Sequence, residues 1–250
     1  MQADRKEKIA AFDGWLYAHR GFHQKPDAPE NSLAAFRRAV ERGYGMELDV
    51  HLLKDGTLAV LHDSVLKRMT GLDGKVEDLT GDDLKTCFLG KSRETIPTFR
   101  EVLDVVDGKT PLIVELKPVG GNDAALTDAA CAMLKDYKGL YCVESFSPLV
   151  VRHLAKHYPD IIRGQLCLNY LKTPEGLTFP EALAATFLLH NFLGHPDFIA
   201  YKFADRKNLA NRFCLRALKK QGVAWTIRTP QDLETAKAEG LWPIFERFEP

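Results

Sequence analysis

Residues 45–50 read GMELDV, a short apolar run that contains two acidic residues, Glu47 and Asp49. A run this short and this apolar is typical of a strand buried in a parallel sheet. Successive side chains of a strand point to opposite faces, so two carboxylates two positions apart should point to the same side. The stretch therefore predicts a buried strand that presents a pair of acids on one face.

Similar apolar runs recur along the chain, and longer amphipathic segments separate them. The runs that we interpret as strands are residues 15–19, 45–50, 112–116, 141–145, 163–168, 198–202, 223–227 and 241–245, with a companion run at 58–62. The segments that we interpret as helices are residues 32–42, 98–106, 123–137, 148–157, 180–192, 207–221 and 231–239. This alternation is typical of βα units around a parallel sheet. A chain of 250 residues with eight such strands predicts an α/β fold, a TIM-like (β/α)8 barrel.

The alternation loosens over residues 51–97, which contain the turn-rich stretches KDGT, GLDGK and LTGDD. A segment of this length exceeds a routine barrel loop, so we expect a small insertion near the active face, after the second strand. The chain contains no Gly/Ser-rich or Pro-rich linker and no repeat other than the βα alternation. We therefore expect residues 1–250 to form a single domain.

The composition limits the partners and the compartment. Lys plus Arg and Asp plus Glu total 34 each, so no overall basic field would attract nucleic acid. The five cysteines lack CxxC spacing, which predicts buried thiols in a reducing compartment rather than disulfides or a zinc site. Residues 1–15 carry both charges and lack the roughly 7–15 apolar residues of a signal peptide. These features predict a cytoplasmic protein.

The longest apolar-rich tract, residues 183–193, is much shorter than the roughly 20 residues that span a bilayer. We interpret it as part of a barrel helix and expect no stable membrane anchor. An exposed helix that touches lipid is the alternative.

Acidic side chains gather at the carboxyl ends of the second and third predicted strands, where barrel enzymes place catalytic groups. Glu115 and Lys117 share one face at the end of the third strand, as Glu47 and Asp49 do in the second. Carboxylates gathered at one barrel mouth would repel each other and raise each other's pKa unless a cation holds them ionised. Oxygen ligands favour Ca²⁺ or Mg²⁺ over zinc. The sequence therefore predicts one divalent metal ion; solvated or ion-paired rim acids are the alternative.

Two of the eight histidines, His19 and His62, end a predicted strand beside a charged residue. Two histidines that flank a metal can serve as general base and general acid near neutral pH, and the order of the two roles is open. Arg20 and Lys117 would supply the positive charge that a phosphodiester needs in its transition state.

Motifs of several other enzyme classes are absent from the sequence. It contains no GxxxxGK[ST], no GxGxxG after a strand, no GxSxG and no HExxH. Nucleotide-binding, dinucleotide-binding and serine-esterase functions are therefore not supported. An amidohydrolase on the same barrel would open with an HxH pair, whereas His23 lies four positions after His19.

In order and spacing, these residues resemble the glycerophosphodiester phosphodiesterase family, whose members are PLC-like phosphodiesterase TIM barrels. HRG at 19–21 and PENS at 29–32 are similar to the opening of the family pattern. ELDV at 47–50, KDG at 54–56, HD at 62–63, IPT at 96–98 and ELK at 115–117 continue the pattern. The agreement is dense from residue 18 to about 118 and weaker beyond: Arg228 stands where the family often has asparagine, and the ending IFERF at 244–248 replaces a frequent TD-x-P.

The resemblance implies a role for each candidate residue. Glu47, Asp49 and Glu115 would bind the metal, and His19 and His62 would be the acid/base pair. Residues assigned to substrate binding are Arg20 and Lys117 on the phosphate, Glu30 and Asn31 bracing the mouth, and Trp225 as a wall for the glycerol moiety.

The implied reaction is metal-dependent hydrolysis of a glycerophosphodiester, a small-molecule substrate, to glycerol 3-phosphate and an alcohol. The alternative is a lysophospholipase D or phospholipase-type activity on a lipid phosphodiester, with residues 183–193 on the membrane. A third hypothesis is a protein that binds phosphate and metal without turnover. Neither the alcohol headgroup, nor a cyclic phosphate intermediate, nor the oligomeric state follows from the sequence.

Overall fold

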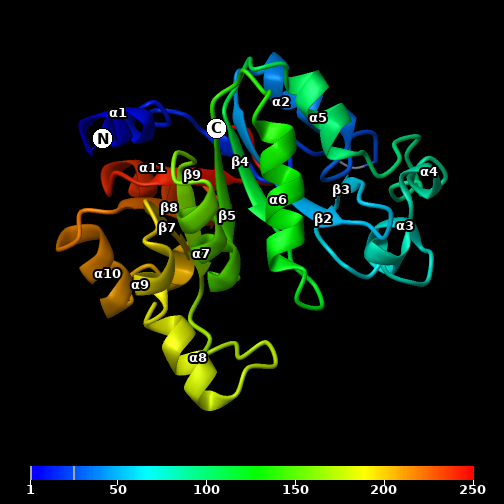
Figure 1. The fold of residues 1–250 in the computed structure, drawn as a ribbon. Helices are drawn as coiled ribbons and strands as arrows, with labels where there is room; N and C mark the ends of the chain where they lie inside the picture. Colours follow the sequence, from blue (N-terminus) through cyan, green and yellow to red (C-terminus); the bar gives the residue numbers. More distant parts are fainter. Residues whose placement is uncertain (1, 25) are drawn as a thin grey trace. The chain divides into compact units, whose positions relative to one another are not determined.

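The computed structural model describes residues 2–24 and 26–250, and the chain divides into two units. One unit is Trp15–Tyr141, and the other consists of Met1–Gly14 and Cys142–Pro250. Figure 1 shows the elements of both. Each unit is described in turn.

The unit Trp15–Tyr141 is built around β2 (Gly45–Leu52), which is buried along almost its whole length. β1 (Tyr17–Ala18) and β4 (Leu112–Leu116) pair with it in parallel, and β3 (Leu58–Val60) pairs with it antiparallel. The helices of this unit are α2 (Leu33–Glu41), α3 (Lys67–Thr70), α4 (Gly81–Leu84), α5 (Phe99–Val106) and α6 (Asp123–Leu134), with a 3₁₀ turn at Val76–Asp78. α2 and α5 pack together, as Figure 1 shows.

Residues 51–97 form a packed segment rather than an open loop. β3, α3 and α4 lie in it, and its apolar side chains form a cluster of their own. Buried members of that cluster include Leu53, Leu61, Leu66, Val76 and Leu89. The turn-rich stretches seen in the sequence therefore connect short elements over a small core.

The second unit contains five parallel strands in chain order. They are β5 (Tyr141–Ser145), which begins at the unit boundary, β6 (Arg163–Cys167), β7 (Phe198–Lys202), β8 (Gln221–Ile227) and β9 (Trp242–Phe245). The helices of this unit are α1 (Gln2–Ala10), α7 (Pro148–His157), α8 (Phe179–Thr186), α9 (Asn191–Gly194), α10 (Leu209–Arg216) and α11 (Pro230–Ala238), with a 3₁₀ turn at Phe203–Asp205.

Eight of the strands in residues 2–24 and 26–250 run parallel to a neighbour, helices separate most of them in sequence, and β3 is the extra strand on β2. This is the element order of an α/β TIM-like barrel, and the predicted fold class is confirmed. The five cysteines are buried and free, also as predicted. Within the described part of the chain, no helix has both the length and the apolar character needed to cross a bilayer. The single domain stays a prediction.

The predicted helices differ from the structure in several places. The one at 207–221 is shorter, because α10 covers Leu209–Arg216 and β8 begins at Gln221. The expected helix at 180–192 is split, because the backbone of Leu188 is left-handed, with φ of 55°, and ends the helical path between α8 and α9. The helix α1 was not predicted. Arg5 on α1 forms an ion pair with Asp197 at 2.5 Å, and the backbone N–H of Arg163 donates to the same carboxylate at 2.9 Å. Long-range pairing of this kind leaves no local pattern in the sequence.

Gly164 on β6 provides a test of the packing in this unit. A Cβ at this position would overlap the ring of Phe198 on β7, which is fully buried. We expect Gly164→Ala to lower the free energy of unfolding by about 1–3 kcal/mol, as measured by urea denaturation. In the double variant with Phe198→Leu, the loss of unfolding free energy should be smaller than the sum of the losses in the two single variants. The smaller side chain at position 198 leaves room for the added methyl group. Strict additivity would contradict the proposed clash.

Candidate active site

Three carboxylates meet where β2 and β4 run side by side. In the register of these parallel strands, Asp49 lies beside Glu115, and Glu47 lies two residues before Asp49 on the same face. All three side chains are buried, and one carboxylate oxygen of each lies within 4.8 Å of the others. The sequence prediction that these acids come together is therefore correct.

The chain just after β1 places Arg20 against these acids. Arg20 has a left-handed backbone with φ of 57°, and its N–H donates to Glu47 Oε2 at 3.1 Å. The next residue, Gly21, is also left-handed, and a Cβ there would lie 3.0 Å from Ala35. The left-handed conformation of an arginine costs about 1–2 kcal/mol of conformational free energy. The contacts of the Arg20 side chain offset this cost. Its guanidinium donates to Glu30 at 2.6 Å, and its Nε lies 3.5 Å from Asp49 Oδ2.

Asn31 and Lys117 complete the surroundings of Asp49. Asn31 is left-handed, which asparagine tolerates well, and its amide donates to Asp49 Oδ2 at 2.8 Å. Lys117, just beyond β4, lies 3.4 Å from Asp49 Oδ1 and donates to Glu115 Oε1 at 2.9 Å. Both substrate-binding candidates with positive charge, Arg20 and Lys117, are thus within the acidic cluster.

The environment drives the pKa values of the neighbouring acids apart. Burial favours the neutral form of Asp49, but Lys117 and Arg20 outweigh it and hold the pKa of Asp49 far below its usual range. Burial, together with the charge of Asp49, raises the pKa of Glu115 to about 7, although Lys117 opposes the shift. Without a metal, Asp49 is therefore ionised at neutral pH, and Glu115 is near its midpoint.

The structure alters the argument for a metal. Arg20 and Lys117 already balance two of the three carboxylates, so repulsion among the acids does not by itself require a cation. The fit rests instead on the oxygens. Asp49 Oδ1 and Asn31 Oδ1 are buried and accept no hydrogen bond from any residue in the described ranges. A converging set of carboxylate and amide oxygens suits a hard cation, and Glu47, Asp49 and Glu115 could hold one.

His62 lies two residues after β3, near enough to Asp49 for their charges to interact. Its Nδ1 forms a hydrogen bond with Asp63 Oδ1 at 2.6 Å, and Arg68 donates to Asp63. Arg68 also donates two hydrogen bonds to Glu30, at 2.7 and 3.1 Å. Burial lowers the pKa of His62, although the charge of Asp49 opposes the shift. With Nδ1 occupied by Asp63, the Nε2 atom is the one left for chemistry.

Glu30 links the acidic cluster to the segment that carries His62, because it accepts hydrogen bonds from both Arg20 and Arg68. Burial alone would raise its pKa, but the two arginines lower the pKa of Glu30 to about 2. Glu30 therefore connects Arg20 and Arg68, and its role in bracing the mouth stays a prediction. Arg68, to which the sequence analysis assigned no role, is the residue that completes the bridge.

His51 was missed at the sequence level. It is buried on β2, its Nδ1 is 2.7 Å from Glu77 Oε1, and its Nε2 is 3.3 Å from the carbonyl oxygen of His62. Ser64 donates to the other oxygen of Glu77 at 2.7 Å. The alternation that pairs Glu47 with Asp49 extends to residue 51, so the strand pattern itself carried the signal.

The remaining predicted residues divide between the units. His19 follows β1, with its Nε2 3.9 Å from Glu47 Oε2. Trp225 belongs to β8 in the second unit, where its indole donates to the carbonyl of Ala200 at 2.9 Å and its ring packs edge-on against Phe146. The assignments of the acid/base pair, the metal ligands and the glycerol wall stay predictions.

Comparison with known proteins provides independent evidence on the family of this chain. The sequence model of the glycerophosphoryl diester phosphodiesterase family matches residues 19–245. A glycerophosphodiester phosphodiesterase of Caldanaerobacter subterraneus subsp. tengcongensis is 34% identical over 239 residues, 90% of each chain.

Solved structures agree with this match. A phosphodiesterase of Oleispira antarctica in complex with the product sn-glycerol-3-phosphate has a TM-score of 0.78 and 25% identity, over 94% of both chains. A glycerophosphodiester phosphodiesterase of Thermotoga maritima has a TM-score of 0.71 and 25% identity, over 93% of this chain and 94% of that one.

The carboxyl of Glu115 should titrate near pH 7 in the metal-free protein, well above an ordinary glutamate, because burial and Asp49 favour its neutral form. Carboxyl ¹³C NMR measures this midpoint, and Glu115→Gln assigns the signal. Lys117→Met should move the midpoint higher by removing a cation that favours the charged form, whereas Lys109→Met on the exposed surface should leave it unchanged. A midpoint below about 5 would contradict this account of the site.

Proposed function

We infer the reaction from one premise: the chain belongs to the glycerophosphoryl diester phosphodiesterase family and is a phosphoric diester hydrolase. We propose that it hydrolyses glycerophosphodiesters to glycerol 3-phosphate and an alcohol. The observation that carries the proposal is the buried group of Glu47, Asp49 and Glu115 with Arg20 and Lys117 among them. The product complex of the Oleispira antarctica relative supports glycerol 3-phosphate as the product.

Glu47, Asp49 and Glu115 would hold one divalent cation, Ca²⁺ or Mg²⁺. Such an ion, when bound, polarises a phosphoryl oxygen and lowers the pKa of a nearby hydroxyl or water. Arg20 and Lys117 hold positive charge beside this position and would stabilise the negative charge that develops on the phosphate oxygens. Asn31 keeps Asp49 oriented through its amide hydrogen bond.

His19 and His62 would transfer the protons. The carboxylate of Glu47 lies 3.9 Å from His19 Nε2, and Asp63 orients the ring of His62 through the hydrogen bond to Nδ1. We assign His19 as the general base and His62 as the general acid that protonates the leaving alkoxide. The two roles can be exchanged without changing the proton balance.

The alternative is a lysophospholipase D or phospholipase-type reaction on a lipid phosphodiester. Exposed apolar side chains around residues 179–192, among them Phe179 and Phe192, support keeping it as a test arm. Turnover of glycerophosphocholine, glycerophosphoethanolamine and lysophosphatidylcholine by the purified chain, followed by ³¹P NMR, separates the two. Release of glycerol 3-phosphate from the first two supports the proposal, and turnover of the lipid alone supports the alternative.

His19→Ala and His62→Ala should each lower kcat by about 10²–10⁴, the usual contribution of a positioned general acid or base. The assay is glycerol 3-phosphate release from glycerophosphocholine with Ca²⁺ or Mg²⁺ present. His157→Ala, on the exposed end of α7, is the matched control and should keep full activity. If both site variants kept near-native turnover, the acid/base mechanism would be abandoned.

Metal affinity should weaken as the pH falls below about 7, because Glu115 has a raised pKa and must lose its proton to become a ligand. Titration calorimetry with Ca²⁺ and with Mg²⁺ should show affinity lower by up to about tenfold at pH 6 than at pH 7. Chelation should abolish turnover and the preferred ion should restore it. Glu115→Gln should lose most of the affinity together with its pH dependence; equal affinity at both pH values would overturn the assignment.

A further inference from the structure

A strongly basic segment surrounds α10 in a chain whose total charge is zero. Residues 206–220, RKNLANRFCLRALKK, contain six basic and no acidic residues. The same segment contains four leucine or phenylalanine residues besides Ala210, Cys214 and Ala217. A basic amphipathic stretch of this kind is typical of surfaces that meet a membrane or an acidic partner. It lies wholly in the second unit and contributes nothing to the acidic cluster.

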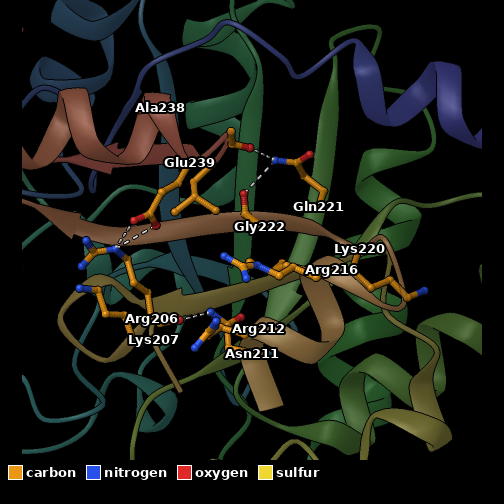
Figure 2. A pocket seen from close by; sticks show the side chains of 13 residues that line it. Arg206, Lys207, Asn211, Arg212, Arg216, Lys220, Gln221, Gly222, Ala238 and Glu239 are labelled. Atoms are coloured by element: carbon orange, nitrogen blue, oxygen red, sulfur yellow. Dashed lines mark hydrogen bonds and ion pairs between the residues drawn. The ribbon is translucent and has the colours of Figure 1, made fainter. Parts of the chain in front are cut away.

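Five of the six basic side chains, all except Lys219, line a cleft of about 660 Å³ between α10 and the end of α11. Figure 2 shows Arg206, Lys207, Arg212 and Arg216 around it, with Glu239 held by Arg206. That pair is 3.0 Å long and neutralises one cation. Among the described residues, Lys207, Arg212 and Arg216 have no ion-pair partner, so the cleft carries an unbalanced positive charge.

The other side of α10 borders an apolar groove of about 400 Å³. Large apolar side chains that line it are exposed to solvent, with exposed fractions of 58% for Leu189, 70% for Phe192, 59% for Phe213 and 52% for Leu218. Lys220 lines both the groove and the basic cleft. The two features are therefore continuous around α10.

Such exposure is concentrated in this part of the molecule. Of the thirteen large apolar side chains that are exposed among the described residues, nine lie between Leu171 and Leu218. On α10 itself, Leu209 and Phe213 are four positions apart, as are Arg212 and Arg216, so an apolar stripe and a basic stripe run next to each other on the outer surface. We call Leu189, Phe192, Phe213, Leu218, Arg212, Arg216 and Lys220 the α10 face.

We propose that the α10 face binds the surface of an anionic lipid bilayer. Phenylalanine and leucine side chains bury apolar area when they enter the interfacial region of the bilayer, which favours binding. Nearby lysines and arginines are attracted to the anionic headgroups. The charge complementarity favours this occupant over a second copy of the chain, because two α10 faces would bring like charges together. Binding would be peripheral and reversible, in keeping with the lack of a spanning helix in the described part of the chain.

Sedimentation with sucrose-loaded vesicles tests the proposal on the full chain. The protein should pellet with vesicles of phosphatidylglycerol and phosphatidylcholine, remain in the supernatant with phosphatidylcholine alone, and be released by 0.5 M NaCl, because exposed charges are screened at high salt. Arg212→Glu with Arg216→Glu should reduce the bound fraction about tenfold or more. Phe192→Ser with Phe213→Ser should reduce binding even at low salt.

Matched controls lie elsewhere on the surface. Lys135→Glu with Lys138→Glu carries the same charge change on the exposed end of the α6 region, and Phe88→Ser with Leu149→Ser also replaces two exposed large apolar side chains by serine. Both should bind as the unaltered chain does. Retained turnover of a water-soluble phosphodiester, together with an unchanged circular dichroism spectrum, shows that each variant is folded. Arg212→Gln with Arg216→Gln, a milder change, serves if the charge reversal does not fold.

Three outcomes would overturn the proposal. The unaltered chain could stay in the supernatant with anionic vesicles, or the variants of the α10 face could bind as tightly as the controls. Sedimentation velocity could also reveal a dimer that Phe192→Ser with Phe213→Ser dissociates, which would identify a second copy of the chain as the occupant.

Discussion

The buried carboxylate of Asp49 is the constraint on which the first unit depends. A charge at this depth is stable only if other groups replace its water, and Asn31, Lys117 and Arg20 do so from three separate segments. Each of those segments must then adopt a definite path. The left-handed backbone at Arg20 and Asn31 and the position of Lys117 after β4 are the structural results. None of the three interactions is local in sequence, so the acid at the centre of β2 organises residues well before and after it.

The acidic cluster also shows which parts of the site could be predicted from the sequence. Glu47, Asp49 and Glu115 could be predicted together because strand periodicity and the meeting of parallel strands at one edge are local or topological rules. Their counter-charges could not be quantified, since the distances from Arg20 and Lys117 depend on turn geometry. Repulsion among acids therefore looked like a stronger argument for a metal than it is. The buried oxygens Asp49 Oδ1 and Asn31 Oδ1, which accept no hydrogen bond within the described residues, are a stronger argument for a metal, and only the structure reveals them.

Elsewhere the failures of prediction share one cause. The split between α8 and α9 arises from the backbone at Leu188, and α1 is held by the pairing of Arg5 with Asp197. The first is decided by a backbone conformation and the second by a contact distant in sequence, whereas the sequence pattern shows only the periodicity of hydrophobic residues. The strand predictions fared better because buried strands of a parallel sheet are apolar in any context. The basic character of residues 206–220 was visible in the sequence, but the neutral total charge concealed it.

The segment after β2 has a more direct part in the site than its character as an insertion suggests. It has its own apolar cluster, which fixes Leu66 and Met69 beside Arg68. From that position Arg68 contacts both Asp63 and Glu30, and Glu30 contacts Arg20. His62 is thus tied through charged hydrogen bonds to the same arginine that borders Asp49, while His51 contacts its backbone carbonyl from β2. A network of charge-assisted bonds is stiff because each member is costly to leave unpaired. The packing of the insertion therefore controls the position of His62 relative to the acids.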